Sequence, residues 1–426
     1  MLLKESVYWW DTAPPLTDHS NKPLPDRADV VVIGSGYTGL SAARTLAMHG
    51  AKVCVLEKET IGWGASSRNG GQVLTGLRLG PSALIKQVGL VRARELYAAS
   101  LKSMEYVEQL IAAEQIDCEY SRVGHIEAAF KPKHFEHYRH EQAILAREFN
   151  HPVKLLSRTE QRAELGSDYY HGLLVDERSG GLHPAKYVRG LALATERLGV
   201  ELCEKAPALA IRRDGSIFKV ATRRGLIIAK DVLVATNGYT DAAVPAIRQR
   251  VFPVGSFIIA TEPLTDALAA DLLPRRRMVF DSKNFLYYFR LSSDNRLLFG
   301  GRAEFKPSAP DSTRRSAEVL RRGLLEVFPE LAKVKIDYAW GGNVCFTLDS
   351  FPHAGRIDGL HFALGYGGHG VAMATYLGAQ IAAMISGAPG ANPFADFPFK
   401  SIPLYDGHPW FLPFGELWYK FMDVIN

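Results

Sequence analysis

One stretch near the amino terminus restricts the possible folds of this chain more than any other. Residues 28–58 read ADVVVIGSGYTGLSAARTLAMHGAKVCVLEK. The stretch begins with an apolar run at 30–33, which is followed by Gly34, Gly36 and Gly39 and by a helical pattern at 40–47. A second apolar run at 53–56 is followed by the acid Glu57. This order of strand, glycine turn, helix, strand and acid is typical of a Rossmann-like domain that binds a dinucleotide.

Each part of this motif has a physical task. Gly34 permits a tight turn, Gly36 lets a pyrophosphate approach the backbone, and Gly39 lets the helix pack on the strand. Glu57 is placed to accept hydrogen bonds from ribose hydroxyls, and its charge disfavours the 2′-phosphate of NADP. The motif leaves NAD and FAD open, because both share the adenosine end.

A polar loop follows the second strand. Residues 61–72 read IGWGASSRNGGQ, which is too rich in Gly and Ser for a helix interior and too polar for a buried strand. We expect it to run back over the pyrophosphate, with Ser66, Ser67, Arg68 and Asn69 against the phosphates or the groups beyond them. The alternative is a flexible surface linker.

A second glycine cluster stands near the end of the chain. Residues 365–380 read GYGGHGVAMATYLGAQ, and a helix is predicted to begin near His369. The amino terminus of a helix attracts negative charge, because its first N–H groups are unpaired and the helix dipole is positive there. A strand predicted at 226–235 ends at Thr236, Asn237 and Gly238, which places polar groups at the edge where open α/β sheets bind ligands.

Composition narrows the class of protein. With 426 residues, 47% of them hydrophobic, the chain can fill the cores of two or three domains. The net charge of +5 is mild, and the basic clusters lack interleaved aromatic residues, so we expect no nucleic-acid binding. The four cysteines lie far apart without a CxxC pair, which argues against disulfides and a metal site and favours the cytoplasm. We expect no signal peptide, and we find no apolar run of the ~18 residues that a membrane span needs.

Six segments together resemble a known superfamily. They read GSGYTGL, GASSRNGGQ, GGLHPAKYVRGLA, VLVATNGYT, YYFRLSSDNRLLFGGR and GYGGHG. In order and spacing they are similar to the D-amino-acid oxidase and glycine oxidase superfamily of FAD enzymes, from about Tyr8 onward. Within it the chain looks most like the γ-glutamylputrescine oxidoreductases, through SRNGGQ, DNRLLFGG and its length.

The resemblance implies an α/β fold with two domains. It predicts a discontinuous Rossmann-like FAD-binding domain (1–80, 155–241 and 335–390) and an α+β substrate-binding domain with a mixed sheet (81–154 and 242–334). Residues 391–426 would form a tail, whose helical pattern places Phe414, Leu417, Trp418, Phe421 and Ile425 on one face. We expect this helix to dock on the body of the protein; contact with a membrane surface or a second subunit is the alternative.

The resemblance also implies a cofactor site for non-covalent FAD. The position where some relatives tether the flavin falls on Gly342, and Cys345 stands too close to the following Thr-x-Asp element. The second glycine helix would face the pyrimidine end of the flavin ring, where negative charge appears on reduction. The predicted FAD contacts are Gly34, Gly36, Tyr37, Thr38, Gly39, Glu57, Lys58, Ala65, Ser66, Ser67, Arg68, Asn69, Gly70, Gly71, Gln72, Thr236, Asn237, Gly238, Gly365, Tyr366, Gly368, His369, Gly370 and Val371.

Substrate contacts are expected on the strands at 256–260 and 284–290. The candidates beside His369 are Phe257, Tyr288 and Arg290, with Arg290 as a clamp for a carboxylate. An exposed strand arginine among core tyrosines is the alternative. Trp340 and Asn343 would border the ring.

The predicted reaction is oxidation of an amine C–N bond by hydride transfer to FAD, followed by hydrolysis of the imine. The predicted substrate is γ-glutamylputrescine, which would give γ-glutamyl-aminobutyraldehyde and ammonia. The electron acceptor is O₂ or another molecule; RLLFGG lacks the lysine that favours oxygen in some relatives. Oxidation of glycine, sarcosine or another amino acid, and an FAD-binding scaffold without turnover, are the alternatives. The sequence leaves the oligomeric state open.

Overall fold

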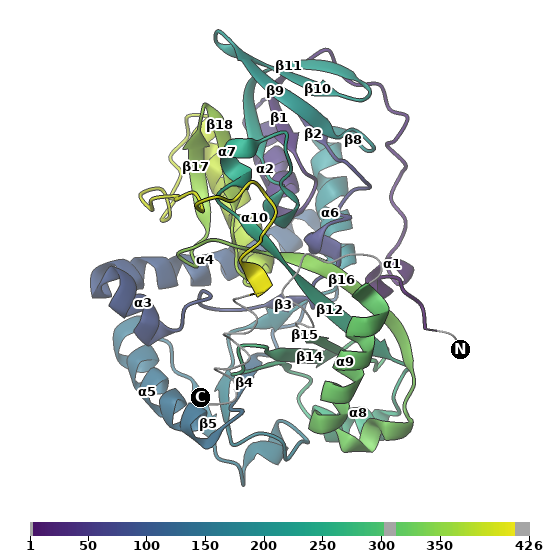
Figure 1. Ribbon diagram of the computed structural model, residues 1–426, viewed down its shortest axis with the longest axis vertical. Coiled ribbons are helices and arrows are strands. Elements are labelled where there is room, and N and C mark those ends of the chain that lie inside the picture. Colours follow the sequence, from purple (N-terminus) through teal and green to yellow (C-terminus); the bar gives the residue numbers. More distant parts are fainter. Residues whose placement is uncertain (1–2, 302–311, 414–426) are drawn as a thin grey trace.

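The computed structural model describes residues 3–301 and 312–413, which contain two eight-stranded sheets. In Figure 1 the first sheet occupies the upper part of the molecule and the second the lower part, with helix α10 (Gly370–Ile385) near the centre. This mixed α/β architecture confirms the predicted fold class. The predicted tail helix with Phe414, Leu417, Trp418, Phe421 and Ile425 lies outside the described residues.

The first sheet is built around β1 (Arg27–Ile33), whose last four residues are buried. Its parallel neighbours are β2 (Val53–Leu56) and β11 (Gly225–Val234), and Val31 stands opposite both Cys54 and Val232. The remaining strands are β8 (Glu201–Cys203), β9 (Ala208–Asp214), β10 (Ile217–Thr222), β17 (His353–Ile357) and β18 (Leu360–Leu364). The carboxyl ends of the three central strands therefore meet at one edge, as the sequence predicted.

The second sheet has the order β16-β12-β15-β14-β13-β4-β6-β5. Its strands are β4 (His125–Ala128), β5 (Lys154–Leu156), β6 (Leu173–Asp176), β12 (Phe252–Thr261), β13 (Met278–Asp281), β14 (Tyr287–Leu291), β15 (Leu297–Gly301) and β16 (Ile336–Phe346). Neighbours run antiparallel except β13 and β4. A third sheet pairs only β3 (Gln72–Val73) with β7 (Gly180–Gly181).

Sheet membership departs from the predicted domain boundaries at β5, which straddles residues 154 and 155, and at two further strands. Strands β6 and β16 fall within the segments assigned to the FAD-binding domain, yet both pair in the second sheet. Their partners are β4 and β12, which lie far away in sequence. Local sequence patterns predict a strand but not its partner, so the boundaries at 155 and 335 do not follow the sheets.

Helices cover both sheets. Besides α10 they are α1 (Tyr8–Asp11), α2 (Tyr37–Met48), α3 (Pro81–Val88), α4 (Leu90–Glu114), α5 (Pro132–Phe149), α6 (Pro184–Arg197), α7 (Pro245–Arg248), α8 (Asp266–Leu272) and α9 (Ser312–Val327). Short 3₁₀ helices span Ala65–Ser67, Gln161–Ala163, Asn237–Tyr239 and Pro329–Lys333. One apolar core joins α2, α4, α6 and α10 to the first sheet, and a second joins α8 and α9 to one face of the second sheet.

Helices α2 and α10 pack directly on each other, although they come from opposite ends of the chain. A Cβ atom at Gly378 would lie only 2.4 Å from the carbonyl oxygen of Thr38, so the crossing depends on glycine there. The Ser41 hydroxyl donates to the carbonyl of Thr375 at 2.7 Å. The two glycine-rich helix starts are thereby brought to the same place.

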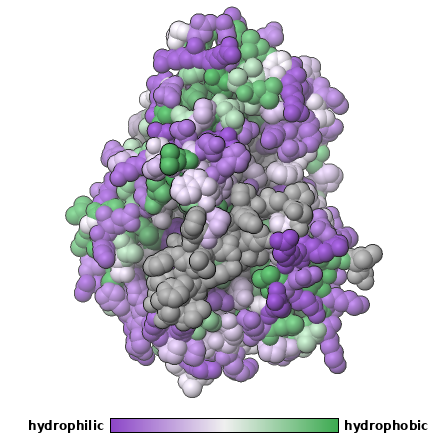
Figure 2. Space-filling model, in the orientation of Figure 1, coloured by the Kyte–Doolittle hydropathy of each residue, from purple (hydrophilic) through white to green (hydrophobic). Residues whose placement is uncertain are grey.

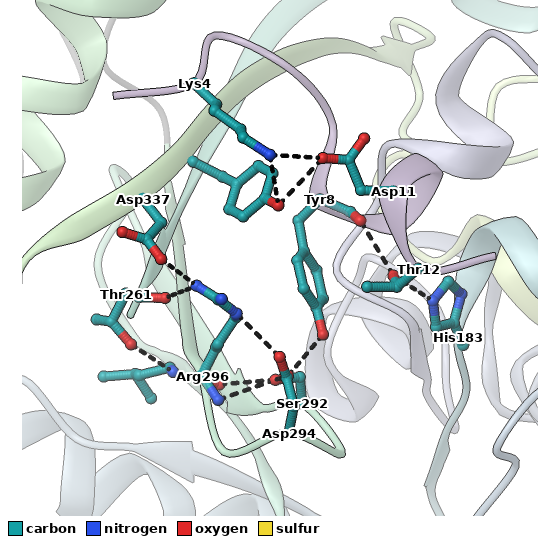
Figure 3. A network of polar contacts seen from close by, with 12 residues as sticks. Lys4, Tyr8, Asp11, Thr12, His183, Thr261, Ser292, Asp294, Arg296 and Asp337 are labelled. Carbon is teal, nitrogen blue, oxygen red and sulfur yellow. Dashed lines mark hydrogen bonds and ion pairs between the residues drawn. The ribbon is translucent and has the colours of Figure 1, made fainter. Parts of the chain in front are cut away.

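Residues 3–12, here called the N-terminal strap, lie across the second sheet. Lys4 forms a parallel bridge with Tyr338 on β16, through backbone hydrogen bonds of 2.8 and 2.9 Å. Figure 3 shows the polar network that anchors the strap: Lys4 Nζ donates to the Tyr338 hydroxyl on β16 at 3.3 Å, and the Tyr8 hydroxyl donates to Asp294 at 2.6 Å. The strap is thus fixed to the second sheet at several points.

The face in Figure 2 is mainly hydrophilic where the chain is described, and its hydrophobic side chains form several separate groups. Within residues 3–301 and 312–413, none of the helices is both long and apolar enough to cross a bilayer. The same residues contain no group of His, Cys, Asp and Glu side chains arranged to hold a metal ion.

Candidate active site

Two cavities lie side by side at the carboxyl edge of the first sheet. The first, of about 440 Å³, is bounded by the ends of β1, β2 and β11 and by the starts of α2 and α10. The second, of about 370 Å³, lies between α10 and the second sheet. They share lining residues, which makes them one continuous site: Ala65, Asn69, Asn343, Val344, Gly367, Gly368 and Val371.

The start of α2 forms one wall of the first cavity. A Cβ atom at Gly36 would lie 2.8 Å from the Ser66 hydroxyl oxygen, so any larger residue would close the gap between helix and loop. That oxygen accepts a hydrogen bond from the backbone N–H of Tyr37 at 3.0 Å. At Gly39 an added Cβ would lie 1.9 Å from the Gly34 carbonyl oxygen, so the helix packs directly on the turn.

Glu57 stands at the end of β2 with its carboxylate held in place. One oxygen accepts from both the backbone N–H and the hydroxyl of Ser35, at 3.1 and 2.6 Å. The other accepts from the backbone N–H of Glu59 at 2.9 Å. Glu57 lines the first cavity in the position where the sequence predicted a ribose acceptor.

The second glycine cluster forms an adjoining wall of the first cavity. Gly365, Gly367 and Gly368 all have positive φ angles, a conformation that favours glycine. The Asn237 side chain accepts from the N–H of Gly365 at 2.9 Å, which ties this loop to the end of β11. Helix α10 then begins at Gly370 without a side-chain cap, beside the start of α2. Two positive helix ends therefore face one cavity.

His369 lines the second cavity and carries an unsatisfied atom. Its Nδ1 is buried and has no hydrogen-bond partner among the described residues. Burial, followed by the charges of His125 and Arg78, lowers the pKa of His369 to about 4. The ring is neutral at pH 7, and its free nitrogen can bind a ligand group.

Tyr288 and Ser256 line the second cavity from the second sheet. Their hydroxyls lie 2.9 Å apart, across the intervening strand β15. Gly300 on that strand makes this possible, because a Cβ atom there would lie 2.3 Å from the Tyr288 ring. Tyr288 is thus one of the predicted substrate residues that the structure places in the site.

Two other predicted substrate residues lie elsewhere. Phe257 is only 2% exposed and packs in the core beneath α9, on the face of β12 opposite Ser256. Arg290 lines neither cavity, and its Nη1 donates to the carbonyls of Gly71 and Leu182 at 3.1 and 2.9 Å. Burial lowers the pKa of Arg290 to about 10. The Arg290 guanidinium thus supports the wall from behind, and its predicted role as a carboxylate clamp stays a prediction.

Most predicted cofactor contacts line one of the two cavities. The exceptions are Gly39, Ser67, Gly71, Gly238 and Gly365, which lie behind the walls. Of the other residues named from the sequence, Asn343 lines both cavities, Gly342 the second and Cys345 the first, whereas Trp340 lines neither. Burial raises the pKa of the Cys345 thiol to about 12, so it stays protonated.

The second cavity also holds charged residues that the sequence analysis missed. Arg78 lies over the Phe346 ring at 4.4 Å, and Lys283 Nζ lies 3.4 Å from an oxygen of Asp281. Burial raises the pKa of Asp281 to about 6. With Arg68, the described lining contains three cations and one acid. None of the three newly found residues belongs to a motif, so no local signal marked them.

The site fits FAD in its chemistry. The glycine-rich start of α2 offers the close backbone approach that a pyrophosphate needs, and Glu57 can bind the ribose. The start of α10 and the free Nδ1 of His369 are placed for the other end of the cofactor. The described residues that would hold FAD thus come from both glycine clusters and from the loop at 64–72.

Comparisons with known proteins agree with this assignment. The family model DAO, described as FAD dependent oxidoreductase, matches residues 29–384. The chain is 39% identical over 380 residues to the probable oxidoreductase OrdL of Haemophilus influenzae, covering 88% of this chain and 85% of that protein. It is 36% identical over 404 residues to the gamma-glutamylputrescine oxidoreductase of Escherichia coli, covering 93% of each. The structure of glycine oxidase from Geobacillus kaustophilus covers 89% of this chain and 100% of its own, with a TM-score of 0.73 at 23% identity, and shows the fold.

Proposed function

The chain belongs to the DAO family of FAD-dependent oxidoreductases, and from this premise we propose that it oxidises a primary amine whose far end carries a carboxylate, with γ-glutamylputrescine as the substrate. When bound, FAD supplies the acceptor for the hydride that leaves the carbon next to the amine nitrogen. Water then hydrolyses the imine to γ-glutamyl-aminobutyraldehyde and ammonia. The similarity to the Escherichia coli enzyme over 93% of both chains supports this choice of substrate.

The charge of the second cavity is the observation that carries the proposal. Its described lining holds the cations Arg68, Arg78 and Lys283 against the single acid Asp281. The side chains of Lys283 and Asp281 are 9% and 0% exposed and form an ion pair, so the excess positive charge comes from Arg68 and Arg78. A partly buried cavity with excess positive charge favours a ligand that brings a carboxylate.

Arg78 is well placed for such a carboxylate. Its guanidinium lies over the Phe346 ring, and the residue lines the second cavity, where its positive charge would attract a carboxylate. It lies beside Gly367, where a Cβ atom would be 3.0 Å from Arg78 Cδ. The glycine thus lets the arginine stem pass close to the loop that leads into α10.

The same charges prepare the amine end for reaction. Hydride loss requires the neutral amine, because an ammonium nitrogen has no lone pair to support the forming imine. Nearby cations lower the pKa of a bound ammonium group and so favour its deprotonated form. His369 is neutral, so it adds no further charge beside the bound amine. The paired hydroxyls of Tyr288 and Ser256 offer further polar contacts.

The test is the visible spectrum of the purified holoenzyme under anaerobic conditions. We expect rapid bleaching of the flavin by γ-glutamylputrescine, and slow or no bleaching by putrescine, glycine and D-alanine. Bleaching by an amino acid but not by γ-glutamylputrescine would overturn the proposed substrate while leaving the family assignment intact. Admitting air to the bleached enzyme then shows whether O₂ or another molecule is the electron acceptor.

A further inference from the structure

The loop at residues 65–71 lies between the two cavities of the site. Ala65 and Asn69 line both cavities, and Arg68 and Gly70 line the second. Inside the loop, the Asn69 side chain donates to the carbonyl of Ala65 at 3.0 Å and accepts from the N–H of Gly71 at 2.7 Å. Any movement of this loop would therefore change the shape of both cavities together.

Three tryptophan indoles hold this loop from outside. The Nε1–H of Trp9 donates to the carbonyl of Asn69 at 2.9 Å, and that of Trp10 donates to the Ser67 hydroxyl at 2.8 Å. A third bond runs from Trp340 on β16 to the carbonyl of Arg68, at 2.9 Å. Three consecutive residues of the loop, 67–69, thus each accept one indole N–H.

Trp10 also fixes the charged side chain of the loop. The Arg68 guanidinium lies 4.7 Å from the Trp10 ring and 4.3 Å from the Trp63 ring. Its nitrogens donate to the carbonyls of Trp63 and Gly341, at 2.8 and 3.0 Å. The guanidinium is therefore held on several sides at the edge of the second cavity.

The strap that supplies Trp9 and Trp10 is anchored away from the loop. Tyr8 bonds to Asp294, and the Thr12 hydroxyl lies 2.9 Å from His183 Nε2 at the start of α6 (Figure 3). Trp9 itself is 1% exposed, with its ring against His183 at 4.7 Å. These anchors belong to the second sheet and to α6, so the strap links both to the loop.

We propose that the N-terminal strap is a positioning element of the active site, which holds the loop at 65–71 through the indole N–H groups of Trp9 and Trp10. The strap sets where Arg68 and Asn69 stand toward the cofactor and the substrate cavity. This role depends on the FAD site and not on which amine the enzyme oxidises.

The test compares FAD release from four holoenzyme variants with that from the unchanged enzyme. Trp9→Phe and Trp10→Phe keep an aromatic ring but remove the N–H, and Tyr8→Phe removes an anchor of the strap. Trp410→Phe is the matched control, because its indole N–H also donates to a carbonyl, that of Leu404 at 3.2 Å, on an exposed part of the chain. Release is followed by the fluorescence of free flavin, and the unfolding temperature is measured on the same samples.

We expect Trp9→Phe and Trp10→Phe to release FAD roughly three- to tenfold faster, as the loss of one hydrogen bond predicts. Tyr8→Phe should accelerate release to a smaller extent, because the Tyr8 hydroxyl bonds to Asp294 and acts on the loop only through the strap, and Trp410→Phe should have no effect. A lower unfolding temperature with release rates within twofold of the unchanged enzyme would overturn the proposal, because it would mark a purely structural role. Equal acceleration by Trp410→Phe would overturn it as well. If Trp9→Phe does not fold, Trp10→Phe and Tyr8→Phe decide the outcome alone.

Discussion

Thr38 Oγ1 and the Tyr366 hydroxyl lie 2.7 Å apart, in a buried hydrogen bond between residues 328 positions apart in the chain. Thr38 stands in the first turn of α2, and Tyr366 in the loop before α10. Burial raises the pKa of Tyr366 well above its ordinary value, so the hydroxyl keeps its proton. This one bond joins the two helix starts that together line the cofactor cavity.

Removing that bond should loosen the cofactor site. We expect Tyr366→Phe and Thr38→Val each to destabilise the protein by about 1 kcal/mol and to weaken FAD binding about fivefold. The double variant should be little worse than either single one, because both remove the same bond. Chemical denaturation and FAD titration measure the two effects; full additivity would contradict the coupling.

Gly36→Ala tests the close approach of α2 to the loop. The new methyl group would meet the Ser66 hydroxyl at 2.8 Å, so we expect weak FAD binding with a modest loss of stability. Gly36→Ala combined with Ser66→Ala removes the contact between the two side chains. The double variant should recover stability but not FAD affinity, if the backbone at Gly36 lies against the cofactor. Recovery of both in a titration would show that Gly36 only makes room for Ser66.

His369 should give the apoprotein a measurable dependence on pH. Its folded pKa of about 4 lies below the ordinary value of 6.5, so between these values the unfolded chain binds a proton that the folded one lacks. Stability from this group is complete above about pH 6.5 and falls as the pH drops toward 4. His369→Asn should reduce the slope of the unfolding free energy against pH in this window, by an amount that corresponds to at most one bound proton. Urea unfolding at a series of pH values measures this slope. His49→Asn, at an exposed histidine, is the matched control variant.

We expect Arg290 to contribute to the stability of the protein and not to recognition of the substrate's carboxylate. Arg290→Gln removes charged donors from the carbonyls of Gly71 and Leu182, so we expect a loss of about 2 to 4 kcal/mol in unfolding free energy. The ratio of kcat/KM for γ-glutamylputrescine to that for putrescine should stay the same. A selective loss with γ-glutamylputrescine would restore Arg290 as a carboxylate ligand.

Arg78 is the cation expected to recognise the carboxylate. Arg78→Met keeps much of the stem but removes the charge, so KM for γ-glutamylputrescine should rise roughly tenfold or more, with a smaller change for putrescine. Arg92→Met is the control, because Arg92 also lies over a ring, that of Phe397 at 5.5 Å, outside both cavities. Equal effects on both substrates would argue against a carboxylate at Arg78.

The first sheet and its motif were readable from the sequence because their signals are local. The strand at 53–56 was predicted with its observed ends, since four apolar residues stand between polar ones and Glu57 follows. The glycines of both clusters likewise predicted helix starts, which the structure confirms at α2 and α10. Such patterns depend on neighbours within a few residues.

The substrate side could not be read in the same way. Alternation on β12 was correct, but a sequence does not say which face meets a cavity, and Ser256 rather than Phe257 faces it. Arg290 finds its partners at Gly71 and Leu182, and pairing over such distances leaves no local trace. The same holds for Trp9, whose role depends on a loop sixty residues away.

The packing of α10 on α2 also sets when the enzyme can take up its cofactor. During synthesis, residues 34–39 leave the ribosome long before residues 370–385 are made. The part of the cofactor site at the start of α2 therefore exists for a time without the part at the start of α10. Contacts between segments so distant in sequence form late in folding, because the long intervening chain must be ordered first. FAD can therefore be enclosed only after residues 370–385 have been made, and a nascent chain interrupted before α10 lacks one wall of the cofactor site.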